Sequence, residues 1–416
     1  MLKRPIAIGL SPNTEKDDIL LALKILFSPW QWRRQEEVQK LEKKFAEQFG
    51  KEYQAFAVNS GRGAQYLILK ALGVKKGDEV AIQAFTCTVV PNAILKLKAK
   101  PIYIDIDSSY NMNPRDLAQK ITPKTKAIIV QHTFGLPANL AAIKKIAQEK
   151  KIPLIEDGCH SLGATYQGRL IGSFGEAAFF SFGRDKALSS VFGGIILCRQ
   201  KALAKKIEKL RNQLPLPSFF WTAQQLLHPP LFALILPFYN HLIGKALLVF
   251  LQKLHLLSKA VSYQEKLGRQ PKIFPQKIPG GLAILAQNQL TKLKRFNKHR
   301  RQMAQIYFQS LKNLNLNLPP QIPGASWLRF PIHHPQAQKL YQYAKKRGIL
   351  LGNWYQGIVM PAKNLATVNY KLGSCPKAEK LSSNTINLPT YPCLTTKEAL
   401  KVVQVIKQWL NTKAEK

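Results

Sequence analysis

The alternation of short apolar runs with longer helical stretches is the feature that most limits how this chain can fold. Six apolar runs of five or six residues recur between residues 79 and 198, and they read EVAIQ, PIYIDI, KAIIVQ, PLIED, AAFFSF and GGIILC. Buried parallel strands read as continuous apolar runs, and helical crossovers must separate them. The pattern therefore predicts an α/β domain built on a large, mostly parallel sheet.

Changes in this pattern divide the chain into four predicted segments. Residues 1–35 form an N-terminal segment, and residues 36–212 form the large α/β domain, which opens with an amphipathic helix. Residues 213–264 break the rhythm and contain no acidic residue, so we interpret them as an insertion. Residues 265–416 contain a long basic helix and a final helix, and they predict a linking helix followed by a small C-terminal α+β domain.

Composition indicates a globular protein of a reducing compartment. With 416 residues and 46% hydrophobic content, the chain can bury a large core. Its five cysteines form no C-x-x-C pair and leave an odd one over, so neither a disulfide framework nor a zinc site is expected. The N-terminus has no long apolar stretch typical of a signal peptide. We therefore expect a cytoplasmic protein without a metal ion.

The net charge is strongly positive, because 62 Lys and Arg outnumber 23 Asp and Glu and give +39. Such a charge attracts nucleic acid, anionic membranes or anionic substrates. The lysines are spread along the chain, and no RRM signature, zinc-finger spacing or basic terminal arm is present. We interpret the charge as general surface basicity and expect no specific nucleic-acid partner.

A small-residue segment, NSGRGAQYLILKAL at residues 59–72, precedes a predicted helix. Unpaired backbone N–H groups at a helix start bind phosphate, and Gly61 lies where such a group would be placed. Ordinary N-capping by Ser60 explains the same pattern. This segment alone leaves both interpretations open.

A second segment, PLIEDGCHSLGA, ends an apolar run with Glu156 and Asp157, and His160 follows. Ligand-binding groups gather at the carboxyl ends of parallel strands, where a carboxylate could pair with a protonated pyridine nitrogen. A helix-capping aspartate and a partly buried histidine are the alternative interpretation.

The third segment, AAFFSFGRDKALSSVFGG, places Ser181 at the end of an aromatic run and Lys186 in the turn beyond it. A lysine just past a buried strand can be desolvated, which lowers its pKa and frees the amine for covalent chemistry with a carbonyl. Ser181 could donate a hydrogen bond to a phosphate. A solvated surface lysine is the alternative, because most lysines of so basic a chain are of that kind.

Together these segments resemble the motifs of the DegT/StrS sugar aminotransferases, which are pyridoxal 5'-phosphate (PLP) enzymes of fold type I. The resemblance rests on SG-x-x-A, GDEV-x-x-x-x-x-T at 77–86, IEDGCHSLGA and SF-x-x-x-K. It continues through PIYIDID, the NQLTKL helix, RGILLGNWY and INLPTYPCLT, and so covers most of the chain apart from the insertion. The implied fold is that of a fold type I PLP-transferase.

The resemblance implies a role for each matching residue. Lys186 would be the Schiff-base lysine and the acid and base of the reaction, Asp157 would pair with the ring nitrogen, and His160 would lie against the ring. The phosphate would be contacted by Gly61, Arg62 and Ser181.

Three positions depart from the family pattern. Cys87 stands where relatives carry an aromatic residue that stacks on the cofactor, so either its thiol packs there or Phe85 supplies the stacking. Arg62 replaces a threonine and could add a cation at the phosphate. Lys277 falls near a position that contacts the phosphate of the partner subunit in relatives, and a homodimer is expected.

The implied function is transfer of an amino group, with glutamate as the expected donor, to a nucleotide-linked or lipid-linked keto sugar in surface-polysaccharide synthesis. Sugar dehydratases among the relatives have histidine in place of the lysine, so Lys186 favours transamination. The alternatives are a dehydratase or a non-sugar aminotransferase of the same fold. A basic regulatory or binding protein on a degenerate PLP fold is the alternative outside enzymes.

The insertion allows two interpretations. Residues 231–251 approach the length of a membrane span, but polar residues interrupt them, and Lys245 would be costly at a bilayer centre. A helix lying on the inner membrane surface, with Lys245 and Lys253 toward the headgroups, would suit the pattern. A helical hairpin buried at the dimer interface or over the active site is the alternative.

Overall fold

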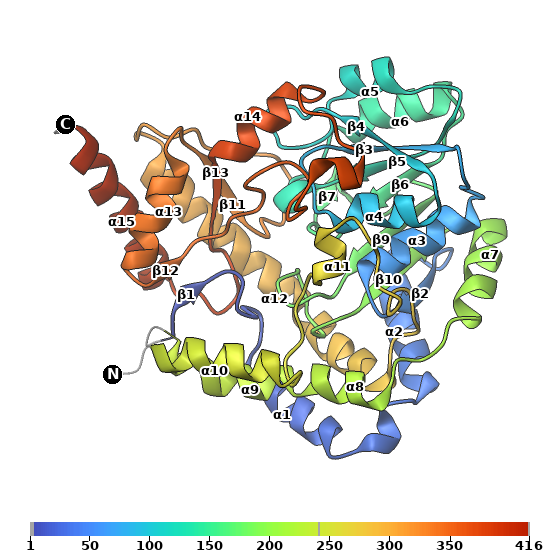
Figure 1. The fold of residues 1–416 in the computed structure, drawn as a ribbon, viewed down its shortest axis with the longest axis horizontal. Coiled ribbons are helices and arrows are strands. Elements are labelled where there is room, and N and C mark those ends of the chain that lie inside the picture. Colours follow the sequence, from blue (N-terminus) through green and yellow to red (C-terminus); the bar gives the residue numbers. More distant parts are fainter. Residues whose placement is uncertain (1–3, 240–241, 415–416) are drawn as a thin grey trace.

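The computed structural model describes residues 4–239 and 242–414, and a seven-stranded sheet forms its centre (Figure 1). The strand order is β4-β3-β5-β6-β9-β10-β2, in which β10 runs antiparallel to both neighbours and the other pairs are parallel. The strands are β2 (Gln54–Val58), β3 (Glu79–Gln83), β4 (Lys100–Ile104), β5 (Thr125–Gln131), β6 (Leu154–Asp157), β9 (Ala177–Ser181) and β10 (Gly194–Cys198). The predicted mostly parallel sheet is confirmed, and every predicted apolar run contributes a strand.

Helices cover both faces of this sheet, which explains the continuous apolar runs. Neighbouring residues of β10 enter different cores: Ile196 packs on one face and Ile195 on the other. The first face carries α3 (Gly61–Ala71), α4 (Val89–Lys96) and α7 (Lys201–Asn212). The second carries α2 (Gln35–Glu47), α5 (Pro114–Lys120), α6 (Leu140–Glu149) and part of α12 (Gly280–Leu311). A short hairpin, β7 (Thr165–Tyr166) with β8 (Arg169–Leu170), lies outside the sheet.

The small domain follows the 32-residue helix α12, which contacts both α2 and the final helix. Its antiparallel pair is β11 (Phe330–His333) with β13 (Thr385–Leu388). The other elements are α13 (Ala337–Lys346), β12 (Ile349–Leu350), α14 (Pro376–Asn384) and α15 (Thr396–Ala414). An α+β composition of this part agrees with the sequence-based expectation.

The N-terminal segment is more structured than its sequence indicated. Strand β1 (Ile6–Ala7) pairs in parallel with β12 of the small domain, and α1 (Lys16–Leu26) follows. The helix predicted from residue 36, α2, is therefore preceded by a strand and a helix that the sequence did not indicate. The reason is tertiary, because Ala22 and Ile25 of α1 find their apolar partners in distant parts of the chain.

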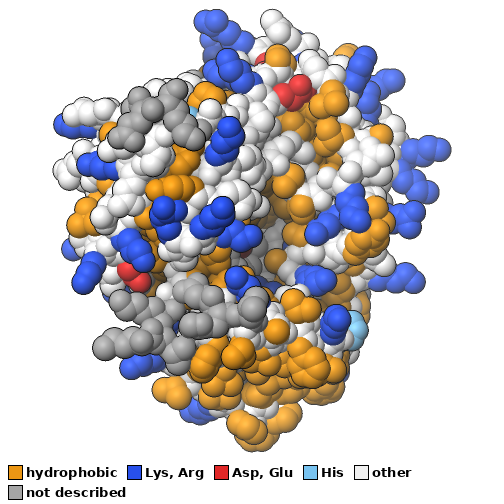
Figure 2. All heavy atoms as spheres, turned by 60° about the vertical axis from the view of Figure 1, so that its left-hand side comes forward, with side chains coloured by type: hydrophobic (Ala, Val, Ile, Leu, Met, Phe, Trp, Pro, Cys, Tyr) orange, Lys and Arg blue, Asp and Glu red, His pale blue; other side chains and the backbone are white. Residues whose placement is uncertain are grey.

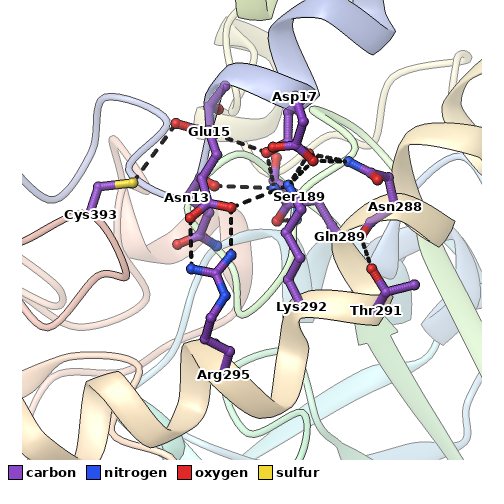
Figure 3. A network of polar contacts seen from close by, with 12 residues as sticks. Asn13, Glu15, Asp17, Ser189, Asn288, Gln289, Thr291, Lys292, Arg295 and Cys393 are labelled. Atoms are coloured by element: carbon purple, nitrogen blue, oxygen red, sulfur yellow. Dashed lines mark hydrogen bonds and ion pairs between the residues drawn. The ribbon is translucent and has the colours of Figure 1, made fainter.

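Ion pairs fix α1 to α12 (Figure 3). The Lys292 ammonium lies 3.3 Å from Glu15, 2.5 Å from Asp17 and 3.0 Å from Asp18. Arg295 forms a bidentate salt bridge with the Glu15 carboxylate, with N–O distances of 2.9 and 2.6 Å. The three carboxylates lie close enough together to hold a metal ion, but Lys292 already pairs with all three and Arg295 with Glu15.

Three helices of the predicted insertion form a layer along the lower edge of the molecule in Figure 1: α8 (Phe219–Leu226), α9 (His228–Ile235) and α10 (Leu242–Lys253), with a 3-10 turn at Leu236–Phe238. The short helix α11 (Tyr263–Lys266), at the end of the insertion, lies near the centre of the picture. Helix α1 packs beside α8 and α9, and the His228 ring is 2.7 Å from the Ser11 hydroxyl. No helix within the described residues is long and apolar enough to cross a bilayer.

Candidate active site

The three informative segments of the sequence meet at one edge of the sheet. Strands β2, β6 and β9 run in the same direction, so the start of α3, the end of β6 and the turn after β9 share the carboxyl edge. A cavity of about 350 Å³ opens there, a size that suits a small-molecule site. Its lining includes all seven residues singled out from the sequence: Gly61, Arg62, Cys87, Asp157, His160, Ser181 and Lys186.

The first turn of α3 forms one wall of the cavity. Ser60 caps the helix, because its hydroxyl accepts the Gly63 N–H at 3.1 Å, and Gly61 follows as the first helical residue. The geometry requires glycine: a Cβ on Gly61 would lie 2.9 Å from the Ser181 Cβ. Capping and anion binding are therefore compatible here, since other N–H groups of the first turn remain available to a ligand.

Arg62 lies in this wall but is already engaged within the chain. Its guanidinium forms an ion pair with the buried Glu265 and donates to the Ala260 carbonyl at 3.0 Å. It also lies 4.7 Å from the ring centroid of Phe274. The sequence predicted an extra cation at a phosphate, and in the structure Arg62 pairs within the chain with Ala260 at the end of the insertion and with Glu265 just beyond it.

The two neighbouring carboxylates at the end of β6 point to opposite sides of the strand. Asp157 lines the cavity and accepts the Cys159 N–H at 3.0 Å, and burial raises the pKa of its carboxyl group. Glu156 instead accepts three backbone N–H groups of the 172–175 loop at 2.7–2.9 Å. Asp157 forms no ion pair with the described residues, so a cationic ligand atom could pair with it.

His160 presents a neutral ring to the cavity. Burial lowers the pKa of His160 well below its ordinary value, and the nearby charges of Lys186 and Arg329 lower it further. The ring stacks on Trp354 with centroids 4.9 Å apart and planes 17° apart. A neutral stacked imidazole can pack against a flat aromatic ligand.

Cys87, at the position of the missing aromatic residue, faces the cavity. Burial raises the pKa of its thiol, which therefore stays protonated and acts as a small apolar group. Phe85 is fully buried beneath the site and packs edge-on against Tyr355, with ring centroids 5.3 Å apart. Of the two alternatives weighed from the sequence, the structure brings Cys87 to the cavity and keeps Phe85 outside it.

The turn that carries Lys186 is held through its backbone. The Asn13 side chain donates to the Lys186 carbonyl at 2.5 Å, and Arg300 donates to the Ala187 carbonyl at 2.9 Å. Arg300 is fully buried and also donates to the Asn13 side chain at 3.0 Å. The N-terminal segment and α12 therefore fix the position of Lys186, although neither adjoins it in sequence.

Several lining groups were not found from the sequence. Arg184 and Asp185 of the lysine turn line the cavity, and the small domain contributes Trp354. Arg329 pairs with Asp185 at 2.9 Å and lies 3.2 Å from the centroid of the Trp354 ring. Burial lowers the pKa of Arg329 to about 10. Arg184 and Asp185 adjoin Lys186 in the chain, whereas Arg329 and Trp354 meet them only because the two domains pack together.

Lys277, the proposed counterpart of a cross-subunit residue, does not line the cavity. Its backbone N–H donates to the Pro215 carbonyl at 3.0 Å, and it forms an isolated bridge with Val58. The structure contains one chain, so the homodimer stays a prediction.

This architecture defines the class of the protein. A seven-stranded sheet of this order, with a small domain that closes one cavity at its carboxyl edge, is the fold of PLP-dependent enzymes of fold type I. The Helicobacter pylori aminotransferase PseC, involved in the biosynthesis of pseudoaminic acid, shares it with a TM-score of 0.77 at 18% identity, over 98% of this chain and all of that one.

Within this class, the chain belongs to the DegT/DnrJ/EryC1/StrS aminotransferase family, whose model matches residues 12–215 and 273–407. It is therefore a PLP-dependent aminotransferase. The unmatched stretch, residues 216–272, contains α8 to α11 and nearly all of the predicted insertion.

Curated relatives support the same family. An uncharacterised protein of Methanocaldococcus jannaschii is 28% identical over 89% of this chain and 89% of its own length. The GDP-perosamine synthase of Escherichia coli O157:H7 is 36% identical over 45% of this chain and 52% of its own length.

Proposed function

We propose that the chain transfers an amino group from glutamate to the keto group of a nucleotide-linked or lipid-linked sugar, for the synthesis of a surface polysaccharide. The similarity to GDP-perosamine synthase supports a sugar substrate. The observation that carries the proposal is that Lys186 and Asp157 line one cavity together with the first turn of α3. The functional unit in this proposal is a homodimer.

The cavity fits PLP in the kinds of groups it offers. Bound there, PLP supplies an electron sink that stabilises negative charge on the substrate carbon. The first turn of α3 and the Ser181 hydroxyl would hold the phosphate, since a helix start offers N–H donors at the positive end of the dipole. The absence of a Cβ on Gly61 lets the start of α3 pack closely against Ser181, which brings these two groups of donors together.

Asp157 would pair with the ring nitrogen of the cofactor and stabilise its protonated form. Burial alone favours the neutral form of this carboxyl group. A protonated ring nitrogen beside it would reverse that preference, because an opposite charge within a few ångströms stabilises the carboxylate. The His160 ring would pack on the cofactor, and its neutral state leaves the pairing with Asp157 undisturbed.

The Lys186 amine would carry the chemistry of the chain itself. Its Nζ lies 4.5 Å from the centroid of the Trp354 ring, on the cavity side of the turn. With PLP bound, Lys186 would be the residue that holds the cofactor covalently. Its Nζ would also take and return the proton at the substrate carbon.

Borohydride reduction tests this assignment. Purified protein should be yellow, and reduction followed by peptide mapping should place the cofactor on Lys186. Lys186→Ala should lose the covalent adduct, whereas Lys345→Ala, an exposed lysine of α13 outside the cavity, should keep it. An adduct on another lysine, or a colourless protein that takes up no PLP, would refute the assignment.

Product analysis tests the sugar reaction. With glutamate and a nucleotide-linked 4-keto sugar, the enzyme should form an amino sugar and 2-oxoglutarate in equal amounts. A deoxy sugar without nitrogen would indicate the dehydratase alternative instead.

A further inference from the structure

One surface of the molecule concentrates exposed apolar side chains. Of the fifteen large apolar side chains that are exposed in the described part of the chain, twelve lie at residues 20–30 or 219–254. Figure 2 shows apolar side chains gathered at the lower end of the molecule, where Figure 1 places α1 and α8 to α10. We call this surface the apolar face. Its members on α9, α10 and the turn that follows are Leu234, Ile243, Leu247, Val249, Phe250 and Leu254.

The exposed side chains of the apolar face are not core residues of a poorly packed segment. The inner sides of α9 and α10 have a core of their own, which contains Phe232, Ile235, Leu251 and Leu257. Outward, Ile243 is 70% exposed and Phe250 is 56% exposed. Helices with a satisfied inner side and an apolar outer side need a second apolar environment.

The charges around the face indicate what that environment is. Residues 213–264 contain Lys245, Lys253 and Lys259 and no acidic residue. A twofold contact between two copies would set this face against itself and bring these lysines together without a carboxylate partner. An anionic lipid surface offers both an apolar layer and negative headgroups.

We propose that the apolar face docks the enzyme on a bilayer that contains anionic lipid. Helix α10 would lie in the plane of the interface, with its apolar side chains among the acyl chains and Lys245 and Lys253 among the headgroups. The family model does not match residues 216–272, so α8 to α10 lie outside the part of the chain that the family model describes.

The same segment connects the apolar face to the cavity. Ser258 accepts a hydrogen bond from Arg184 at 2.5 Å through its carbonyl, and Ala260 and Val261 line the cavity. Ala260 follows Lys253 by seven positions, which span at most about 25 Å even when fully extended. Docking would therefore hold this wall of the cavity close to the membrane surface.

Flotation of the full chain with lipid vesicles tests the proposal. The protein should float with vesicles of phosphatidylcholine and phosphatidylglycerol and float much less with phosphatidylcholine alone. Binding should weaken in high salt without vanishing, because salt screens the charges but leaves the apolar contact. No flotation with anionic vesicles would overturn the proposal.

Two variants separate the apolar and charged contributions. Substituting Ile243, Val249, Phe250 and Leu254 by serine should lower partitioning at least about tenfold, because the apolar contact supplies most of the affinity. Lys245→Gln with Lys253→Gln should lower binding to anionic vesicles roughly fivefold per lysine and leave neutral vesicles unaffected. Partitioning equal to that of the unsubstituted chain in both variants would contradict the proposed surface.

The control carries serine at Leu372 and Leu400, two exposed apolar residues outside the apolar face, and should float like the unsubstituted chain. The oligomeric state is measured on the same samples by light scattering. A dimer that dissociates in the four-serine variant, together with absent flotation, would show that the face joins two copies of the chain and would overturn the membrane proposal. Retained PLP absorbance shows that a variant is folded.

Discussion

The two carboxylates at the end of β6 allow a sharp separation of function from stability. Asp157 lines the cavity, whereas Glu156 accepts backbone N–H groups on the other side of the strand. We predict that Asp157→Asn lowers the rate of transamination by about 10²–10³-fold, the usual loss when one preorganised electrostatic partner is removed. The free energy of unfolding should change little, because an amide oxygen can still accept the Cys159 N–H.

Glu156→Gln should give the opposite result. Its Oε1 accepts the N–H groups of Phe174 and Gly175, and its Oε2 accepts that of Gly172. A glutamine oxygen can keep the first two bonds, but its NH₂ group then faces the Gly172 N–H and leaves a buried donor unpaired. The cost of that donor, with the weakening of the other two bonds, is about 3 kcal/mol.

The assay combines single-turnover kinetics with urea unfolding on both variants. Asp157→Asn should show the rate loss with an unchanged unfolding midpoint, and Glu156→Gln should show a lower midpoint with a rate within about threefold of the original enzyme. The reasoning is refuted if Glu156→Gln loses the activity while Asp157→Asn retains it, since the cavity would then depend on the wrong carboxylate.

Two further predictions concern the first turn of α3 and the predicted insertion. Gly61→Ala should weaken PLP binding about tenfold in an absorbance titration, because overpacking costs ~1–3 kcal/mol, whereas Gly9→Ala, outside the cavity and with no neighbour within 4 Å, should bind normally. Burial lowers the pKa of His228 well below its ordinary value of 6.5. Below pH 6.5 the unfolded state therefore binds more protons than the folded state, and the free energy of unfolding decreases as the pH is lowered. Hydrogen exchange of α8 to α10, relative to the intrinsic rate, should therefore accelerate from about pH 7 to pH 5, and His228→Gln should remove that dependence.

The sequence was most informative where structure depends on neighbours along the chain. The apolar runs gave the strands of the parallel sheet, because a strand buried on both faces needs apolar residues at every position. The edge strand β2 was missed, since its first residue is exposed and its partner β10 lies about 140 residues away, at Gly194–Cys198 against Gln54–Val58. Sequence periodicity carries no information about such a pairing.

The candidate site divides in the same way. Gly61, Asp157, Ser181 and Lys186 stand at strand ends and helix starts, and the resemblance of their motifs named them as candidates that the structure brings to one cavity. Trp354 lies in RGILLGNWY, which also carries the resemblance, but sequence reasoning assigned it no role because it reaches the cavity from the small domain.

The sequence by itself indicated the family through the resemblance of its motifs, and it predicted the sheet through its apolar runs, which depend only on neighbours along the chain. Only the tertiary structure decided how distant segments combine. It pairs Arg62 with Glu265, holds the Lys186 turn through Asn13 and Arg300, and places α1 beside the insertion. These contacts depend on which surfaces pack together when the whole chain folds. The free energy of that long-range packing depends on distant segments together, so no single segment predicts it.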